Sequence, residues 1–213
     1  MSWRCATALL ALVGGATLAR ASEPIVLVES LPLSGAGFTT SSRIVAGTNA
    51  AIDAFNRAGG VGGRHVRLVT ADDGNDPARH AANLRRLVEE VHPAAFLNCV
   101  GDAACAAAAG VARATQVALI GPMSGAASLR AIADAPVYCI RPDVALEAAA
   151  LAGQLRSLGV GSVAILTDRR GPDRTPEILA EALRRKGLES FIVRADPSKC
   201  WRRCSRRTAP RDS

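Results

Sequence analysis

The fold class is decided by residues 42–90, which read SRIVAGTNAAIDAFNRAGGVGGRHVRLVTADDGNDPARHAANLRRLVEE. Residues 42–60 carry apolar side chains at helical spacing and stop at two glycines, and residues 65–71 have the composition of a strand. Residues 76–90 open with an aspartate suited to an N-cap and a proline at the first helical position. Helix, strand and helix in this order are typical of a parallel α/β sheet.

The same alternation extends over most of the chain. We expect further strands at 25–30, 93–100, 117–120, 137–140, 162–167 and 189–195, and further helices at 102–116, 143–159 and 176–187. Neither the helical spacing of apolar residues nor the alternation typical of strands continues beyond about residue 195. The sequence therefore predicts an α/β fold made of βαβ units, in which ligands bind at the carboxyl ends of the strands.

Both ends of the chain differ from its body. Residues 1–21 combine a basic start, an apolar run and small residues, which is typical of a cleavable signal peptide, with a retained apolar helix as the alternative. Residues 196–213 form a basic tail whose Cys200 and Cys204 lack the second ligand pair of a zinc site. The chain carries a net charge of +7, but residues 22–193 are neutral, which argues against a nucleic-acid partner. No later run suits stable membrane insertion.

The polar residues of the body favour structural roles over catalysis. We expect Asp72, Asp73 and Asp76 to form a turn and cap a helix, with metal ligation as the alternative. The three histidines, His65, His80 and His92, lack ligand spacing and are expected at or near the surface.

The body cysteines are Cys99, Cys105 and Cys139, and we expect them to be separate buried thiols, because their odd count and irregular spacing suggest no disulfide framework. A nucleophilic role for Cys99 is the alternative, but no local residue supplies a base. The sequence thus predicts no catalytic residue, no metal and no cofactor.

Two loops are the most informative for binding. GDA, residues 101–103, follows a strand and opens a helix, and IGPMSGA, residues 120–126, follows the next strand. Free backbone N–H groups at such places attract a carboxylate or a similar anion. Ordinary strand-to-helix turns would have the same sequence, so both interpretations stay open at this point.

Four stretches together resemble the leucine/isoleucine/valine-binding protein family. They are LPLSGAG at 31–37, AGTNAAIDAFNRAGGVGGRHVRLVTADDGNDPARHAANLRRLVEE at 46–90, VALIGPMSGAASLR at 117–130 and IRPDVALEAAALAGQL at 140–155. The resemblance covers residues 24–193 and implies a type I periplasmic binding fold. It implies a three-layer, parallel-sheet N-terminal ligand-binding domain over 22–141. An incomplete second α/β domain would follow over 142–195.

The resemblance also implies a function. Members of this family are periplasmic substrate-binding subunits of ABC transporters, so we expect a small amino acid or amide-like metabolite as ligand and an inner-membrane ABC permease as partner. A ligand-sensing module for amides or urea, built on the same fold, is the alternative. Because relatives have about twice the length of this body, the chain is expected to be C-terminally truncated, with the tail at 196–213 read out of frame.

The binding residues that the resemblance implies lie in three loops: Ser34, Thr40, Asp102, Ala103, Met123, Ser124 and Gly125. Relatives commonly carry serine or threonine where this chain has Asp102, and a carboxylate facing a ligand carboxylate is unfavourable. An aromatic residue that closes the pocket in relatives is also missing from TDRRGPDRTPE, residues 167–177. We therefore expect the ligand preference to differ from that for branched-chain amino acids, toward an amide, an amine or a cation.

Overall fold

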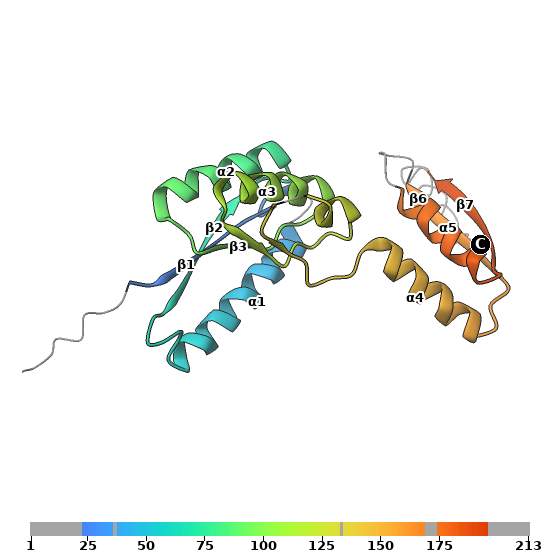
Figure 1. Ribbon diagram of the computed structural model, residues 1–213, viewed down its shortest axis with the longest axis horizontal. Helices are drawn as coiled ribbons and strands as arrows, with labels where there is room; N and C mark the ends of the chain where they lie inside the picture. Colours follow the sequence, from blue (N-terminus) through green and yellow to red (C-terminus); the bar gives the residue numbers. More distant parts are fainter. Residues whose placement is uncertain (1–22, 36–37, 133, 169–173, 196–213) are drawn as a thin grey trace, which may run out of the picture.

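The structure, a computed structural model, describes residues 23–35, 38–132, 134–168 and 174–195. The predictions of a signal peptide and of an aberrant tail therefore lie outside the described residues. Figure 1 shows two α/β lobes joined through the segment that precedes α4. We call them the first lobe, which contains α1 to α3, and the second lobe, which contains α4 and α5.

The first lobe is a five-stranded parallel sheet with helices on both faces. Its strand order is β2-β1-β3-β4-β5. Figure 1 shows α2 and α3 on one face of this sheet and α1 on the other. The elements are β1 (Ile25–Leu31), α1 (Phe38–Arg57), β2 (Val66–Asp72), α2 (Pro77–Val91), β3 (Ala95–Leu97), α3 (Asp102–Thr115), β4 (Ala118–Ile120), the 3-10 helix η2 (Ala127–Arg130) and β5 (Val137–Tyr138).

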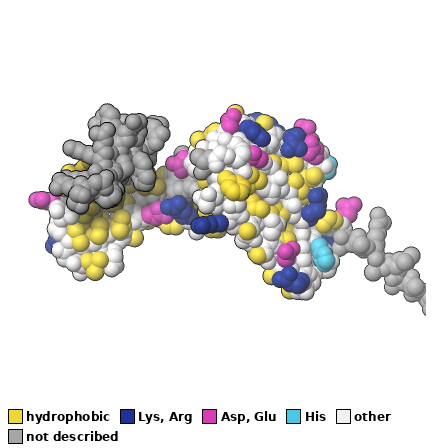
Figure 2. Space-filling view, turned by 180° about the vertical axis from the view of Figure 1, so that it is seen from behind, with side chains coloured by type: hydrophobic (Ala, Val, Ile, Leu, Met, Phe, Trp, Pro, Cys, Tyr) yellow, Lys and Arg dark blue, Asp and Glu magenta, His cyan; other side chains and the backbone are white. Residues whose placement is uncertain are grey.

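The second lobe is smaller. Its elements are α4 (Val144–Ser157), β6 (Ser162–Asp168), α5 (Thr175–Arg185) and β7 (Glu189–Ala195), with β6 and β7 paired in parallel. The α/β fold class with parallel sheets is confirmed. Large apolar side chains remain exposed here, among them Leu166 and Phe191, and Figure 2 shows hydrophobic side chains gathered on a face of this lobe.

Each lobe has its own hydrophobic core. In the first lobe the core lies between the sheet and the α2–α3 pair, and it includes Val28, Phe96 and Leu119 from three adjacent strands. Alanines of α3, such as Ala108 and Ala112, are fully buried, since their small side chains allow the helix to lie close to the sheet and to α2. The second core is a separate cluster: Ala152, Ile165, Leu183 and Leu188.

Local signals explain how α2 begins and ends. Asp76 accepts hydrogen bonds from the backbone N–H groups of Ala78 and Arg79, at 2.8 and 3.4 Å, and thus caps the helix. His92 ends it in the left-handed conformation, with φ of 45°. Asp73 accepts from the backbone N–H of Asn75 at 2.8 Å. The predicted turn-forming and capping roles are confirmed.

The prediction that His80 lies near the surface is wrong. Its side chain is completely buried, and its Nδ1 donates to Asp73 Oδ2 at 2.8 Å. His80 precedes the buried Leu84 by one helical turn, so it belongs to the face of α2 that packs on the sheet. A buried imidazole requires a polar partner, which the equally buried Asp73 supplies.

Among the described residues, the structure has no helix with the length and apolar character needed to cross a bilayer.

The core position of Phe96 gives a first test. We expect Phe96→Ala to lower the free energy of unfolding by about 3–5 kcal/mol, because it removes a fully buried ring from a central strand. The matched control is Phe55→Ala on α1, where the ring is 45% exposed and the loss should stay below about 1 kcal/mol. Urea denaturation followed by circular dichroism measures both, and equal losses would contradict this description of the core.

Candidate functional site

A cavity of about 350 Å³ lies where the carboxyl edge of the first sheet meets the second lobe. One wall consists of Asp102, at the start of α3, and of Met123, Ser124 and Gly125 in the loop after β4. The opposite wall comes from the segment before α4 and from α4 and α5: Arg141, Val144, Glu147, Ala148, Leu151, Thr175 and Leu179. The cavity therefore lies at the strand ends, where α/β folds bind ligands.

The loops after β3 and β4 run side by side beyond the ends of their strands. Asn98 N–H donates to the Ile120 carbonyl and Met123 N–H donates to the Cys99 carbonyl, each at 3.0 Å. Val100 and Met123 also form an isolated parallel bridge. These contacts continue the strand pairing past the regular sheet, and they place Asp102 next to Ser124.

A disulfide between Cys99 and Cys105 closes the turn from β3 into α3, with Cα atoms 5.2 Å apart. The prediction of separate buried thiols is wrong for these two residues, although both are fully buried, and Cys139 is free. The strand-to-helix turn brings two cysteines six positions apart into bonding distance. The bond leaves no thiol for nucleophilic chemistry at Cys99. Asp102 lies within the short loop that the disulfide closes.

Asp102 and Ser124 are joined by a short hydrogen bond. The Ser124 hydroxyl donates to Asp102 Oδ1 at 2.5 Å, and its oxygen accepts from the backbone N–H of Ala126 at 3.1 Å. Ser124 is only 2% exposed, whereas Asp102 is exposed. The hydroxyl therefore has its proton engaged in fixing the carboxylate of Asp102, which faces solvent at the first position of α3.

The opposite wall carries an ion pair. Arg141 donates to both carboxylate oxygens of Glu147, from Nε at 2.6 Å and from a terminal nitrogen at 2.8 Å. These hydrogen bonds lower the pKa of Glu147 and raise the pKa of Arg141, and attraction to Asp102 adds a smaller contribution to the rise. The two walls are thus close enough for their charges to interact.

Gly125 allows the two walls to approach each other. A Cβ atom at this position would lie 2.8 Å from Val144 Cγ2, which is closer than carbon atoms approach in proteins. The Gly125 carbonyl accepts a hydrogen bond from Val144 N–H at 3.0 Å. The loop after β4 is therefore in direct contact with the start of α4, and no other residue type fits there without displacement.

Four of the predicted binding residues line this cavity: Asp102, Met123, Ser124 and Gly125. Ala103 lies next to Asp102 in the first turn of α3, and Thr40 is exposed in the first turn of α1; neither lines the cavity. Sequence reasoning missed Arg141 and Glu147 as site residues. The sequence feature that could have indicated Arg141 is its position between the last strand of the first lobe and the first helix of the second.

Ser34 is engaged elsewhere, at the ends of β1 and β2. Asp72 accepts hydrogen bonds from the backbone N–H groups of Leu33 and Gly74, both at 2.9 Å. The bond from Gly74 and one from the Ser34 hydroxyl lower the pKa of Asp72, with a smaller contribution from Arg79. Asp72 thereby fixes the loop after β1 to the end of the neighbouring strand.

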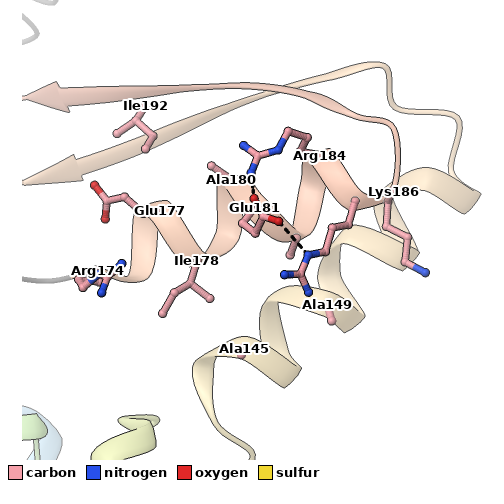
Figure 3. A pocket seen from close by; sticks show the side chains of 12 residues that line it. Ala145, Ala149, Arg174, Glu177, Ile178, Ala180, Glu181, Arg184, Lys186 and Ile192 are labelled. Atoms are coloured by element: carbon pink, nitrogen blue, oxygen red, sulfur yellow. Dashed lines mark hydrogen bonds and ion pairs between the residues drawn. The ribbon is translucent and has the colours of Figure 1, made fainter.

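A larger hollow of about 640 Å³ lies along α4 and α5 (Figure 3). None of the predicted binding residues lines it. One of the residues that line it, Glu181, pairs with Arg185 at 2.8 Å and also with Arg184. All the residues that line this hollow belong to the second lobe, whereas the smaller cavity also includes strand ends of the first sheet. We therefore take the smaller cavity as the candidate binding site.

Metal binding finds no support in the part of the chain that the structure describes. Within it, no three His, Cys, Asp or Glu side chains are grouped so that they could hold an ion. The cavity offers hydrogen-bonding and ionic groups together with the apolar side chains of Met123, Val144, Leu151 and Leu179. This combination suits a small organic molecule with at least one polar group.

Comparison with known proteins agrees with this geometry. A sequence profile described as periplasmic binding protein matches residues 29–197. A substrate-binding periplasmic protein from Ralstonia solanacearum is 27% identical, with a TM-score of 0.70, over 79% of this chain and 48% of that protein. The chain thus spans about half the length of this structure. No curated protein sequence matches the chain.

Two further solved structures share the fold. The branched-chain amino acid transporter substrate-binding protein of Streptococcus pneumoniae, in complex with isoleucine, is 19% identical with a TM-score of 0.71, over 88% of this chain and 54% of that one. An ABC transporter solute-binding protein from Rhodopseudomonas palustris, in complex with 3,4-dihydroxybenzoic acid, is 17% identical with a TM-score of 0.69, over 86% and 52%. The resemblance seen in the sequence is confirmed.

The disulfide predicts a defined chemical behaviour. Alkylation without reduction, followed by peptide mapping, should show Cys99 linked to Cys105 and Cys139 modified. Opening this short loop should lower the free energy of unfolding by about 2 kcal/mol through the entropy of the unfolded chain. A Cys99→Ala/Cys105→Ala variant is the control, since its stability should not respond to reductant through this bond. Alkylated Cys99 in unreduced protein would contradict the pairing.

The lowered pKa of Asp72 predicts a pH-dependent contribution to stability. A carboxyl whose pKa is lower in the folded state stabilises the fold above its ordinary pKa of about 3.9 and loses this effect as the pH falls through the folded value. Asp72→Asn should therefore unfold at lower urea concentration than the parent at pH 7, and the difference should shrink below about pH 4. Asp53→Asn, on the exposed side of α1, is the control. A difference that is independent of pH would contradict this role.

Proposed function

Because the chain belongs to the periplasmic binding protein family, we propose that it is a solute-binding protein of an ABC importer. It binds a small amino acid or a related polar metabolite in the periplasm and presents it to an inner-membrane permease. The observation that carries this proposal is the cavity in which Asp102 and Ser124 of the first lobe face Arg141 of the connecting segment and Glu147 of the second lobe.

The size and lining of the cavity support a ligand with few atoms. A volume of about 350 Å³ is at the lower end of the range for small-molecule sites. The relatives named above were solved with isoleucine and with 3,4-dihydroxybenzoic acid, two compact molecules with one apolar part and one polar part. Apolar contacts from Met123 and Leu151 and polar contacts from Asp102 suit this kind of molecule here.

The two walls suggest how binding is coupled to shape. We treat residues 22–141 and 142–195 as two domains, each with its own core and joined by the segment around Arg141. A ligand that contacts both walls favours the arrangement in which they are close, by the free energy of the added contacts. Such closure is the signal that a permease could distinguish from the empty protein.

We propose no catalytic role for the cavity. The Ser124 hydroxyl is 2% exposed and its proton is engaged with Asp102, so it is not available as a nucleophile. Arg141 and Glu147 form an ion pair that can bind a ligand. The other residues of their wall supply no nucleophile beside it.

A thermal-shift panel tests the proposed function. The full chain should be stabilised by at least one member of a panel of amino acids, amides, amines and small carboxylic acids. The gain is about 2.7 kcal/mol when the ligand is present at one hundred times its dissociation constant. Isothermal titration should give one site per chain. Met123→Ala should weaken binding because it removes apolar contacts from the wall, whereas Asp53→Asn on α1 should not. The proposal fails if no member of the panel raises the unfolding temperature.

A further inference from the structure

The hydrogen bonding of Ser124 removes a donor from the cavity. Its single proton goes to Asp102 Oδ1 at 2.5 Å and its oxygen accepts from Ala126 N–H. A hydroxyl has one proton to donate, so Ser124 cannot also donate to a ligand carboxylate while this bond persists. The loop after β4 therefore uses the hydroxyl proton of Ser124 to hold Asp102, and this hydroxyl has no proton left to donate to a ligand.

Asp102 presents acceptor atoms to the cavity. A carboxylate accepts hydrogen bonds and donates none, and only Oδ1 is used by Ser124. Asp102 stands at the first position of α3, at the end of the helix where the backbone N–H groups point outward. The wall of the first lobe therefore offers a negatively charged acceptor that is accessible to solvent.

The second wall does not reverse this charge. Arg141 is the only basic residue among the described residues that line the cavity, and its guanidinium is held by two hydrogen bonds to Glu147. With two acidic residues and one basic residue, the lining has an excess of one negative charge. A ligand that brings only a carboxylate would meet Asp102 without a counter-ion, and it would have to displace Glu147 from Arg141.

We propose that the cavity selects ligands with a cationic N–H donor, such as an ammonium group, which binds to Asp102. A carboxylate on the ligand is not required. Ser124 acts as a positioning residue, because its hydroxyl holds one oxygen of Asp102 and leaves the other for the ligand. This inference rests on the proposed function and specifies the class of solute that the cavity binds.

The test uses two matched sets of probes on the full chain. One set shares an isobutyl group: 3-methylbutylamine, leucine and 4-methylpentanoate. The other shares a phenyl group: benzylamine, phenylalanine and phenylacetate. Within the set that fits the apolar part of the cavity, we expect the amine to bind most tightly, the amino acid less tightly and the carboxylate most weakly, as measured by thermal shift and isothermal titration.

Asp102→Asn is the decisive variant, because it keeps the shape of the side chain and removes its charge. It should weaken binding of the amine by about tenfold to a hundredfold, the effect of a charged hydrogen bond, and reduce the preference over the carboxylate. Ser124→Ala should weaken amine binding less and keep the preference. Asp53→Asn, with the same change of charge on α1, should leave both unchanged.

The outcomes separate this inference from the proposed function. Tighter binding of the carboxylate than of the amine, or equal affinities of the parent and Asp102→Asn for the amine, would overturn the cationic preference and leave a solute-binding protein of another specificity. A hit from the wider panel that carries no cationic group would have the same meaning. If neither the probes nor the wider panel stabilise the chain, the proposed function fails and this inference fails with it.

Discussion

The cavity depends on one constraint, which is that the loops after β3 and β4 stay aligned beyond the ends of their strands. The bond from Met123 N–H to the Cys99 carbonyl and the bridge between Val100 and Met123 continue the parallel register into irregular backbone. Parallel strands all end at the same edge of a sheet, so this alignment brings Asp102 and Ser124 together from separate loops. The disulfide from Cys99 to Cys105 then holds the first of these loops onto α3.

Most of the fold follows from local patterns in the sequence. Apolar spacing identified the helices, and the two glycines after α1 and the Asp-Pro pair before α2 marked their limits. Boundaries were less accurate: α1 begins at Phe38 and not at residue 42, because its first turn, Phe38–Ser41, is rich in hydroxyl residues and lacks the apolar period. The burial of His80 could have been predicted, since it precedes the buried Leu84 by one helical turn. The absence of metal-ligand spacing, on which the surface prediction rests, carries no information about burial.

The candidate site was predictable only on one wall. Asp102, Met123, Ser124 and Gly125 lie at strand ends, and the order of strands is enough to bring strand ends together. Arg141 and Glu147 reach the cavity because α4 packs against the loop after β4, and this contact depends on how the lobes are placed and not on any periodicity. The disulfide was missed for a similar reason, because cysteine counts and spacings do not report the distance between two side chains in a turn.

Gly125 gives the cavity a property that its larger side chains do not. The two walls touch where the bare α-carbon of Gly125 meets Val144, and both of these residues line the cavity. The approach of the walls thus depends on a backbone position, whereas their chemical character depends on side chains such as Met123 and Leu151. Substitutions at Met123 or Leu151 change the chemical character of the walls. A methyl group at position 125 would instead collide with Val144 and push the two walls apart. In an engineered receptor, that position would be the one with which to tune the aperture.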